Sequence, residues 1–235
     1  MRKEAARGRA ITAGGAIFAR LKALGVDYVF ANSGTDFPPV IEGLAEAAAK
    51  DIDLPSAVVV PHEHAAMSMA HGYYLATGRA QSVILHTNVG LGNAVTGAIN
   101  AACAQVPVLL MSGRTPTTER GRFGCRTVPI GWGQEMRDQT ALMREVSKWD
   151  YELRFPEQIV EVLDRGHAIA NSTPKGPIYI SLPREVLCDR HPVRRRLGSR
   201  VRGAGPAGRG LGLPGLGILG QRQGDQRASP DVRRR

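Results

Sequence analysis

Three short polar stretches contain the residue types that most often do chemistry in proteins, and each follows an apolar run typical of a β-strand. Residues 32–36 form a turn rich in hydroxyl and carboxylate groups, residues 61–64 place a glutamate between two histidines, and residues 86–93 combine a histidine with two glycines and an asparagine. A carboxylate such as Glu63 can act as a general acid or base, and glycine lets a backbone approach a ligand closely. These stretches are the first candidates for a site.

Each stretch also has a purely structural explanation. A glutamate at position 63 would be stabilised by about 0.3–1 kcal/mol in the first turn of a helix. Residues 32–36 are common turn formers. Neighbouring side chains of a helix point apart, and neither His62 nor His64 has a histidine four residues further on, so the sequence predicts no metal site there. The glycines of 86–93 match neither a P-loop nor the three-glycine dinucleotide motif.

The segments around these stretches alternate between helical and strand-like patterns. Short apolar strands alternating with helices predict an α/β fold, with a parallel sheet flanked by helices on both faces. Ligands bind beyond the carboxyl ends of such strands, so three polar stretches at three strand ends favour one shared site. The predicted helices are 12–24, 37–50, 63–77, 93–104, 140–147 and 156–171, and the predicted strands are 26–31, 57–60, 82–86, 107–111 and 176–182.

The positive charge of the chain is concentrated near its C-terminus. The net charge is +10, but residues 189–235 contain 12 Arg, no Lys and three Asp, which leaves 19 basic and 18 acidic residues in 1–188. A body with balanced charge does not favour nucleic-acid binding. RNA binding through the Arg-rich segment is an alternative function of another class, although that segment lacks aromatic residues for base stacking.

Residues 189–235 also differ from the body in composition. They are dominated by Gly, Arg and Pro and show no amphipathic period, as in segments that stay disordered. We therefore predict one folded domain, 10–188, followed by a low-complexity basic tail, 189–235. The tail is either a genuine disordered segment or an out-of-frame translation of a G+C-rich gene. We favour the second origin because the break directly follows a well-formed strand and "SLPREVL".

Neither end of the chain nor its cysteines indicate export. No apolar run reaches the ~18 residues of a membrane span, and no apolar signal-peptide core follows the basic N-terminus. The cysteines at 103, 125 and 188 are an odd number without close spacing, which favours neither a disulfide framework nor a zinc site. We expect a cytoplasmic protein without membrane association.

Four segments, in this order, resemble the N-terminal domain of thiamine-diphosphate-dependent enzymes such as acetolactate synthase and benzoylformate decarboxylase. They are "GVDYVFANSGTDFPPVIEGL", "HEHAAMSMAHGYYLATG", "VGLGNAVTGAINAACAQVPVLLMSG" and "GPIYISLPREVL". The resemblance covers about residues 10–188. It implies the thiamine-diphosphate-binding fold, in which this domain grips the aminopyrimidine end of the cofactor.

The resemblance also implies roles for single residues. Glu63 corresponds to the catalytic glutamate of the family's "HE" motif, which hydrogen-bonds a pyrimidine nitrogen and promotes loss of the thiazolium C2 proton. His86 matches the benzoylformate decarboxylase pattern and is a candidate to contact the substrate carboxylate or shuttle a proton, unless it is only a hydrogen-bonded strand-end residue. Thr35 would bind the same carboxylate. The implied cofactor-binding residues are Glu63, Gly90, Gly92 and Asn93.

The implied function is thiamine pyrophosphate binding in an acetolactate synthase-like enzyme that decarboxylates or ligates 2-oxo acids. "SLPREVL" and the length of the loop 113–135 resemble the synthase branch, whereas "LHTNVGLGN" resembles the benzoylformate-type decarboxylases. The branch and the 2-oxo acid therefore stay open.

The domain that binds magnesium in this family has no counterpart in the sequence. Family members hold the diphosphate through Mg²⁺ with a Gly-Asp-Gly motif and a later Asn, whereas Gly224-Asp225 is followed by Gln. We expect a truncated chain that is inactive alone, or the pyrimidine-domain subunit of a split enzyme whose partner supplies Mg²⁺. Whether the chain by itself is an enzyme stays open, and flavin, which the synthase branch holds on its central domain, is not supported.

The resemblance implies a homodimer or tetramer, because the family pairs this domain with its equivalent in another subunit. Helices 63–77 and 93–104 carry small residues that would permit close helix contact across such a dimer. The alternative is ordinary packing of these helices on the sheet. The small residues are Ala65, Ala66, Ala70, Ala98, Ala101 and Ala102.

Overall fold

The computed structural model describes residues 10–126 and 134–192, which belong to the first of two compact units, Met1–Gly203. The predicted tail from residue 193 onward, including the second unit, Ala204–Arg235, lies outside the described residues. At the centre of the described part is a six-stranded parallel sheet with the order β3-β2-β4-β5-β7-β6. Its strands are β2 (Tyr28–Asn32), β3 (Ser56–Val59), β4 (Gln81–Leu85), β5 (Val108–Arg114), β6 (Asp150–Glu152) and β7 (Ile178–Pro183).

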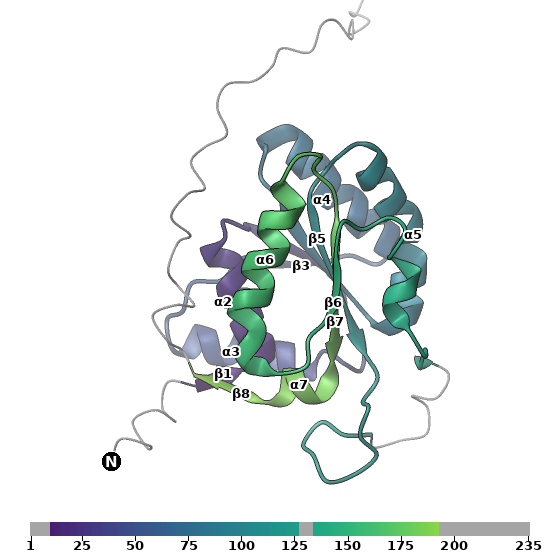
Figure 1. Ribbon diagram of the computed structural model, residues 1–235. Coiled ribbons are helices and arrows are strands. Elements are labelled where there is room, and N and C mark those ends of the chain that lie inside the picture. Colours follow the sequence, from purple (N-terminus) through teal and green to yellow (C-terminus); the bar gives the residue numbers. More distant parts are fainter. Residues whose placement is uncertain (1–9, 127–133, 193–235) are drawn as a thin grey trace, which may run out of the picture. The chain divides into compact units, whose positions relative to one another are not determined.

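Helices cover both faces of this sheet (Figure 1). Because successive side chains of a strand point to opposite faces, Ile84 packs into one core whereas Val83 and Leu85 pack into the other. The predicted α/β architecture is confirmed. The first core contains residues of α2 (Ala13–Ala23), α3 (Pro38–Ala49) and α6 (Ile159–Asn171), and the second contains residues of α4 (Glu63–Thr77) and α5 (Thr87–Cys103).

The two ends of the described fold pair with each other. β1 (Ala10–Thr12) runs antiparallel to β8 (Arg190–Pro192) in a separate two-stranded sheet. Arg190 also makes a 2.5 Å ion pair with Glu46 of α3. The packed structure therefore continues beyond residue 188, where composition placed the end of the domain. Composition could not reveal this pairing because the partner strand lies at the other end of the sequence.

Two predicted helices have different bounds in the structure. α5 begins at Thr87 instead of residue 93. The stretch with two glycines was not predicted as helix, because glycine disfavours helices, but in the structure it forms the first turns of α5. The predicted helix 140–147 is only the short 3₁₀ helix η2 (Gln139–Leu142), followed by turns. The remaining short elements are η3 (Pro156–Gln158) and α7 (Arg184–Cys188).

The small residues of α4 and α5 pack largely within the chain. Ala66, Ala70, Ala98 and Ala101 are each at most 1% exposed and belong to the core under these helices. The two helices also approach each other closely, because a methyl group on Gly97 would lie 2.5 Å from Cβ of Met67. Packing inside this chain accounts for these residues. Among the described residues, no helix has the length and apolar character needed to cross a membrane.

Candidate active site

The carboxyl ends of β2 and β4 meet where the strand order reverses. From β2 the chain passes through α3 to β3 on one side, and from β4 it continues through β5 to β7 on the other. The helices that follow these two strands, α3 and α5, pack into cores on opposite faces. Open α/β sheets bind ligands at such switch points. The predicted stretches 32–36 and 86–93 both begin here.

Asp36 and His86 form the closest polar contact at this position. Oδ1 of Asp36 lies 2.5 Å from Nδ1 of His86, and the aspartate is only 3% exposed. Across the imidazole ring, Nε2 lies 3.0 Å from the amide nitrogen of Gln134. The hydrogen bond to Asp36 raises the pKa of His86, burial works in the opposite direction, and the negative charges of Asp36 and Glu63 add to the rise.

Two glycines leave room for this pair. A methyl group on Gly34 would overlap the ring of His86, and one on Gly113 would overlap the carboxylate of Asp36. The backbone is unusual directly after the histidine, where Thr87 has a φ of 39°, a left-handed value rarely adopted by β-branched residues. Close packing and a tight strand-to-helix junction therefore fix the position of the imidazole.

Glu63 stands in the first turn of α4, and its carboxylate faces α5. Asn93 donates to Oε2 of Glu63 at 3.1 Å, and a methyl group on Gly90 would lie 3.1 Å from Oε1. His62 accepts a hydrogen bond from the backbone N–H of His64 at 3.2 Å, which caps the helix. The structure thus brings Glu63 together with two of its predicted cofactor-binding neighbours and gives His62 a structural role.

The other predicted site residues stand apart from these contacts. Gly92 lies on an exposed part of α5, and a methyl group there would meet nothing within 4 Å. Thr35 is exposed, and within 10–126 and 134–192 its side chain makes no hydrogen bond. Sequence analysis did not single out Asp36 or Gln134. One sequence signal could have identified Asp36: a carboxylate follows the strand that ends at Asn32, and a histidine follows the strand that ends at Leu85.

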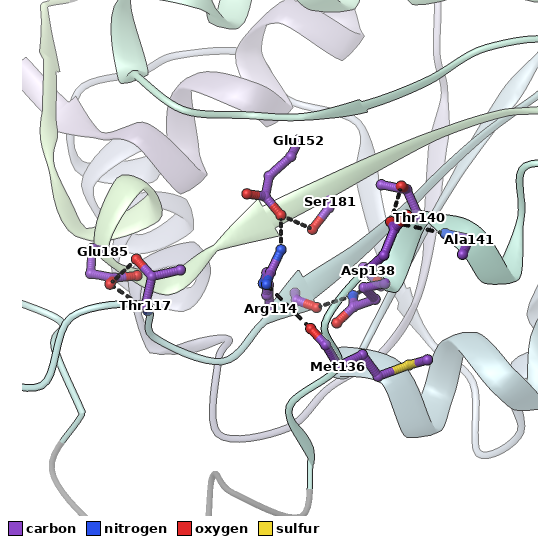
Figure 2. Close-up of polar contacts among 12 residues, drawn as sticks. Arg114, Thr117, Met136, Asp138, Thr140, Ala141, Glu152, Ser181 and Glu185 are labelled. Carbon is purple, nitrogen blue, oxygen red and sulfur yellow. Dashed lines mark hydrogen bonds and ion pairs between the residues drawn. The ribbon is translucent and has the colours of Figure 1, made fainter.

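A second polar cluster lies at the carboxyl ends of β5 and β7 (Figure 2). Arg114 ends β5 and forms an ion pair with Glu152 of β6, which also accepts a 3.5 Å hydrogen bond from Ser181 of β7. Behind it, the amide of Gln139 donates to Ser112 at 2.8 Å and to the hydroxyl of Tyr179 at 3.0 Å. These partners are far apart in the sequence, and sequence analysis identified none of them.

Glu185 of α7 fixes the loop that follows β5. Its Oε1 accepts from the backbone N–H and the hydroxyl of both Thr117 and Thr118, at 2.7–2.9 Å (Figure 2 shows Thr117). Burial alone raises the pKa of Glu185, but the hydrogen bonds from its own backbone N–H and from Thr117 and Thr118 together outweigh it and hold the pKa below its usual value. The carboxylate is therefore a charged anchor that neutral donors of the loop surround on one oxygen.

The described residues leave the Glu63 carboxylate partly open but contain no group that could hold a metal ion. In 10–126 and 134–192, no three His, Cys, Asp or Glu side chains are grouped so that they could hold a metal. By contrast, the glycine at 90 keeps one side of the Glu63 carboxylate uncovered, where a side chain would fill the space. A half-buried carboxyl group in that setting can share a proton with a ring nitrogen.

Comparison with known proteins shows to which family this domain is similar. The family profile described as thiamine pyrophosphate enzyme, N-terminal TPP binding domain, matches residues 11–142. A probable 2-ketoarginine decarboxylase of Pseudomonas aeruginosa is 29% identical over 181 residues, which are 76% of this chain and 30% of that protein. Sulfoacetaldehyde acetyltransferase of Rhodobacter capsulatus is 32% identical over 163 residues, 69% of this chain and 25% of that protein.

A third relative is the large subunit of acetolactate synthase isozyme 3 of Escherichia coli. It is 30% identical over 130 residues, which are 55% of this chain and 21% of that protein. The matched parts therefore span less than a third of each of these three relatives.

Proposed function

We propose that this chain, which belongs to the thiamine pyrophosphate enzymes by virtue of their N-terminal TPP-binding domain, holds the aminopyrimidine end of that cofactor with Glu63. One observation carries the proposal. The Glu63 carboxylate lies at a strand-to-helix junction, accepts a hydrogen bond from Asn93 and adjoins the bare backbone of Gly90. These residues fit a flat ring that presents a nitrogen to a carboxyl group.

Glu63 has a single task in this proposal, which is to hold a proton at the pyrimidine ring nitrogen. Asn93 fixes one carboxylate oxygen, so the group keeps one orientation without a change of rotamer. When bound, thiamine diphosphate would supply a carbon acid whose deprotonated form is a nucleophile toward the carbonyl group of a 2-oxo acid. Gly90 would let the backbone of α5 lie near the cofactor, whereas Gly92, two residues further along the helix, faces another side.

We assign His86 and Thr35 to the substrate. A histidine whose pKa is raised by a carboxylate stays charged over a wider pH range, and it can attract the carboxylate of a 2-oxo acid or transfer a proton. One relative is named for a 2-oxo acid, 2-ketoarginine, and the named reactions differ among the relatives, so the proposal names 2-oxo acids as a class and no single one.

The diphosphate and Mg²⁺ require residues other than those described, where no metal-binding group is found. We propose that another domain or another subunit supplies them, in a homodimer, a homotetramer or a complex with a diphosphate-binding chain. The described residues would then bind the cofactor weakly and not turn over substrate by themselves. Flavin has no assigned place in this proposal.

The experiment replaces Glu63 by glutamine in this chain assembled with a diphosphate-binding domain. Without an ionisable group at the ring nitrogen, cofactor-dependent consumption of the 2-oxo acid should fall by about 10²–10⁴-fold at saturating cofactor. Deuterium exchange at the cofactor C2 position, followed by proton NMR, should slow in parallel. Glu157→Gln, on the exposed surface of η3, is the matched control. Turnover and exchange near the control values would disprove the role of Glu63.

A further inference from the structure

We propose that Asp36 is a positioning residue for His86. Its carboxylate accepts the Nδ1–H of the imidazole and leaves Nε2 as the nitrogen that meets the substrate. The inference rests on the substrate role proposed for His86 and adds a residue that this role did not include. The inference follows from the two polar groups that contact the imidazole of His86, Asp36 at Nδ1 and Gln134 at Nε2.

The two neighbours of the ring have opposite hydrogen-bonding character. An ionised carboxylate can only accept, so the Asp36 contact of 2.5 Å requires a proton on Nδ1. The amide nitrogen of Gln134 can only donate, so its 3.0 Å contact requires a lone pair on Nε2. Together they select the neutral tautomer with Nδ1 protonated, which leaves Nε2 ready to accept a proton.

The contact is also held in place. Asp36 is almost fully buried between the end of β4 and Gly113 of β5, where only glycine leaves space for its carboxylate. Among the described residues, His86 is its only side-chain hydrogen-bond partner, because the second carboxylate oxygen, Oδ2, has none. Its negative charge therefore acts mainly on one ring. A group fixed in this way can orient the imidazole without itself reaching the substrate.

Protonation of His86 must change its contact with Gln134. Once Nε2 carries a proton, the amide nitrogen can no longer donate to it, and the amide has to turn around or move away. An incoming substrate carboxylate can take that place on the charged ring. The charged groups that act on this ring are Asp36 and Glu63, and both are negative, so both favour the protonated form.

The test is ¹⁵N NMR of the full chain labelled in its histidines, without cofactor. Above the titration midpoint of His86, Nδ1 should carry the proton and Nε2 should show the shift of an unprotonated nitrogen; the signals are assigned with His86→Gln. In Asp36→Asn, the amide can present its N–H to Nδ1, so the proton should move to Nε2. The midpoint should also move from above the ordinary histidine value to below it, because burial then prevails.

Two further variants keep the result decisive. Gly113→Ala retains the carboxylate but displaces it, so it should weaken the Nδ1–H preference even if Asp36→Asn does not fold. Asp53→Asn, at an 80% exposed side chain, should leave the His86 signals unchanged. A wild-type ring protonated on Nε2, or a ring unaffected by Asp36→Asn, would overturn the proposal. Since no cofactor is present, a failure of this test is distinct from a failure of the Glu63 experiment.

Discussion

Two carboxylates, Asp36 and Glu185, are each only 3% exposed, yet they have very different partners. Glu185 accepts four hydrogen bonds from two neighbouring threonines, all of them neutral groups that do not titrate. Among the described residues, the side chain of Asp36 has one hydrogen-bond partner, the ring of His86, and histidine titrates in the physiological range. Glu185 lies beyond β7, and Asp36 lies at the switch point between β2 and β4.

This difference in partners distinguishes a carboxylate that fixes a loop, Glu185, from one that contacts a titratable side chain, Asp36. Hydrogen bonds from neutral donors hold a carboxylate charged and keep a loop in place at any ordinary pH. A carboxylate that faces an imidazole forms a unit whose charge changes with pH and with whatever approaches the free nitrogen. Burial is therefore not the feature that distinguishes the candidate site from the second cluster. The chemistry of the partner is.

The largest expected effect on stability comes from removing the anchor. Glu185→Ala leaves the N–H groups of Thr117 and Thr118 without their acceptor, which should lower the free energy of unfolding by about 2 kcal/mol. Urea unfolding of the full chain, followed by tryptophan fluorescence, measures the loss. Glu145→Ala, at an exposed glutamate, is the control. A loss no greater than in the control would mean that Glu185 is not an anchor.

A smaller effect is expected on the pH dependence of the free energy of unfolding, and its sign is opposite for His86 and His167. The pKa of His86 is raised by its hydrogen bond to Asp36, so its contribution to stability is complete below the ordinary histidine pKa and is lost as the pH rises through the folded-state value. The pKa of His167 is lowered by burial, against the charge of Asp164 and together with that of Arg20. Its contribution is present above the ordinary pKa and is lost as the pH falls.

Unfolding free energies between about pH 5 and 8 test both signs. The difference between wild type and His86→Gln should be larger at the acidic end, and the difference between wild type and His167→Gln should be larger at the basic end. Each variant serves as the control for the other, because both remove one histidine. Curves with the same slope for the two variants would contradict the contrast between a paired and a merely buried imidazole.

The sequence reveals one part of the site better than the other. Glu63 and His86 each lie within three residues of the end of an apolar run, so a strand-to-helix junction can be recognised from a few neighbouring residues. Asp36 meets a residue 50 positions away, and Glu185 meets a loop 68 positions away. Alternation of helices and strands predicts a parallel sheet but not the strand order, and that order decides which loops adjoin. Tertiary packing also overrode local preference where glycines became part of α5.

The smallest effect is expected at the exposed edge of the second cluster, where Asp138 meets Arg144 (Figure 2 shows Asp138 with Thr140 and Ala141). Both side chains are nearly half exposed, at 47% and 49%, so solvent screens their 2.9 Å ion pair. The pKa of Asp138 is lowered first by the hydrogen bond from Thr140 and only then by Arg144.

Arg144→Met should therefore leave the urea midpoint within experimental scatter, whereas Asp138→Ala should lower it, because Asp138 also caps η2 by accepting from the N–H of Ala141. Both variants remove this ion pair, but only Asp138→Ala also removes the acceptor of the Ala141 N–H and the Thr140 hydroxyl, so a larger loss there measures these hydrogen bonds. Equal losses would show that the ion pair itself stabilises this edge.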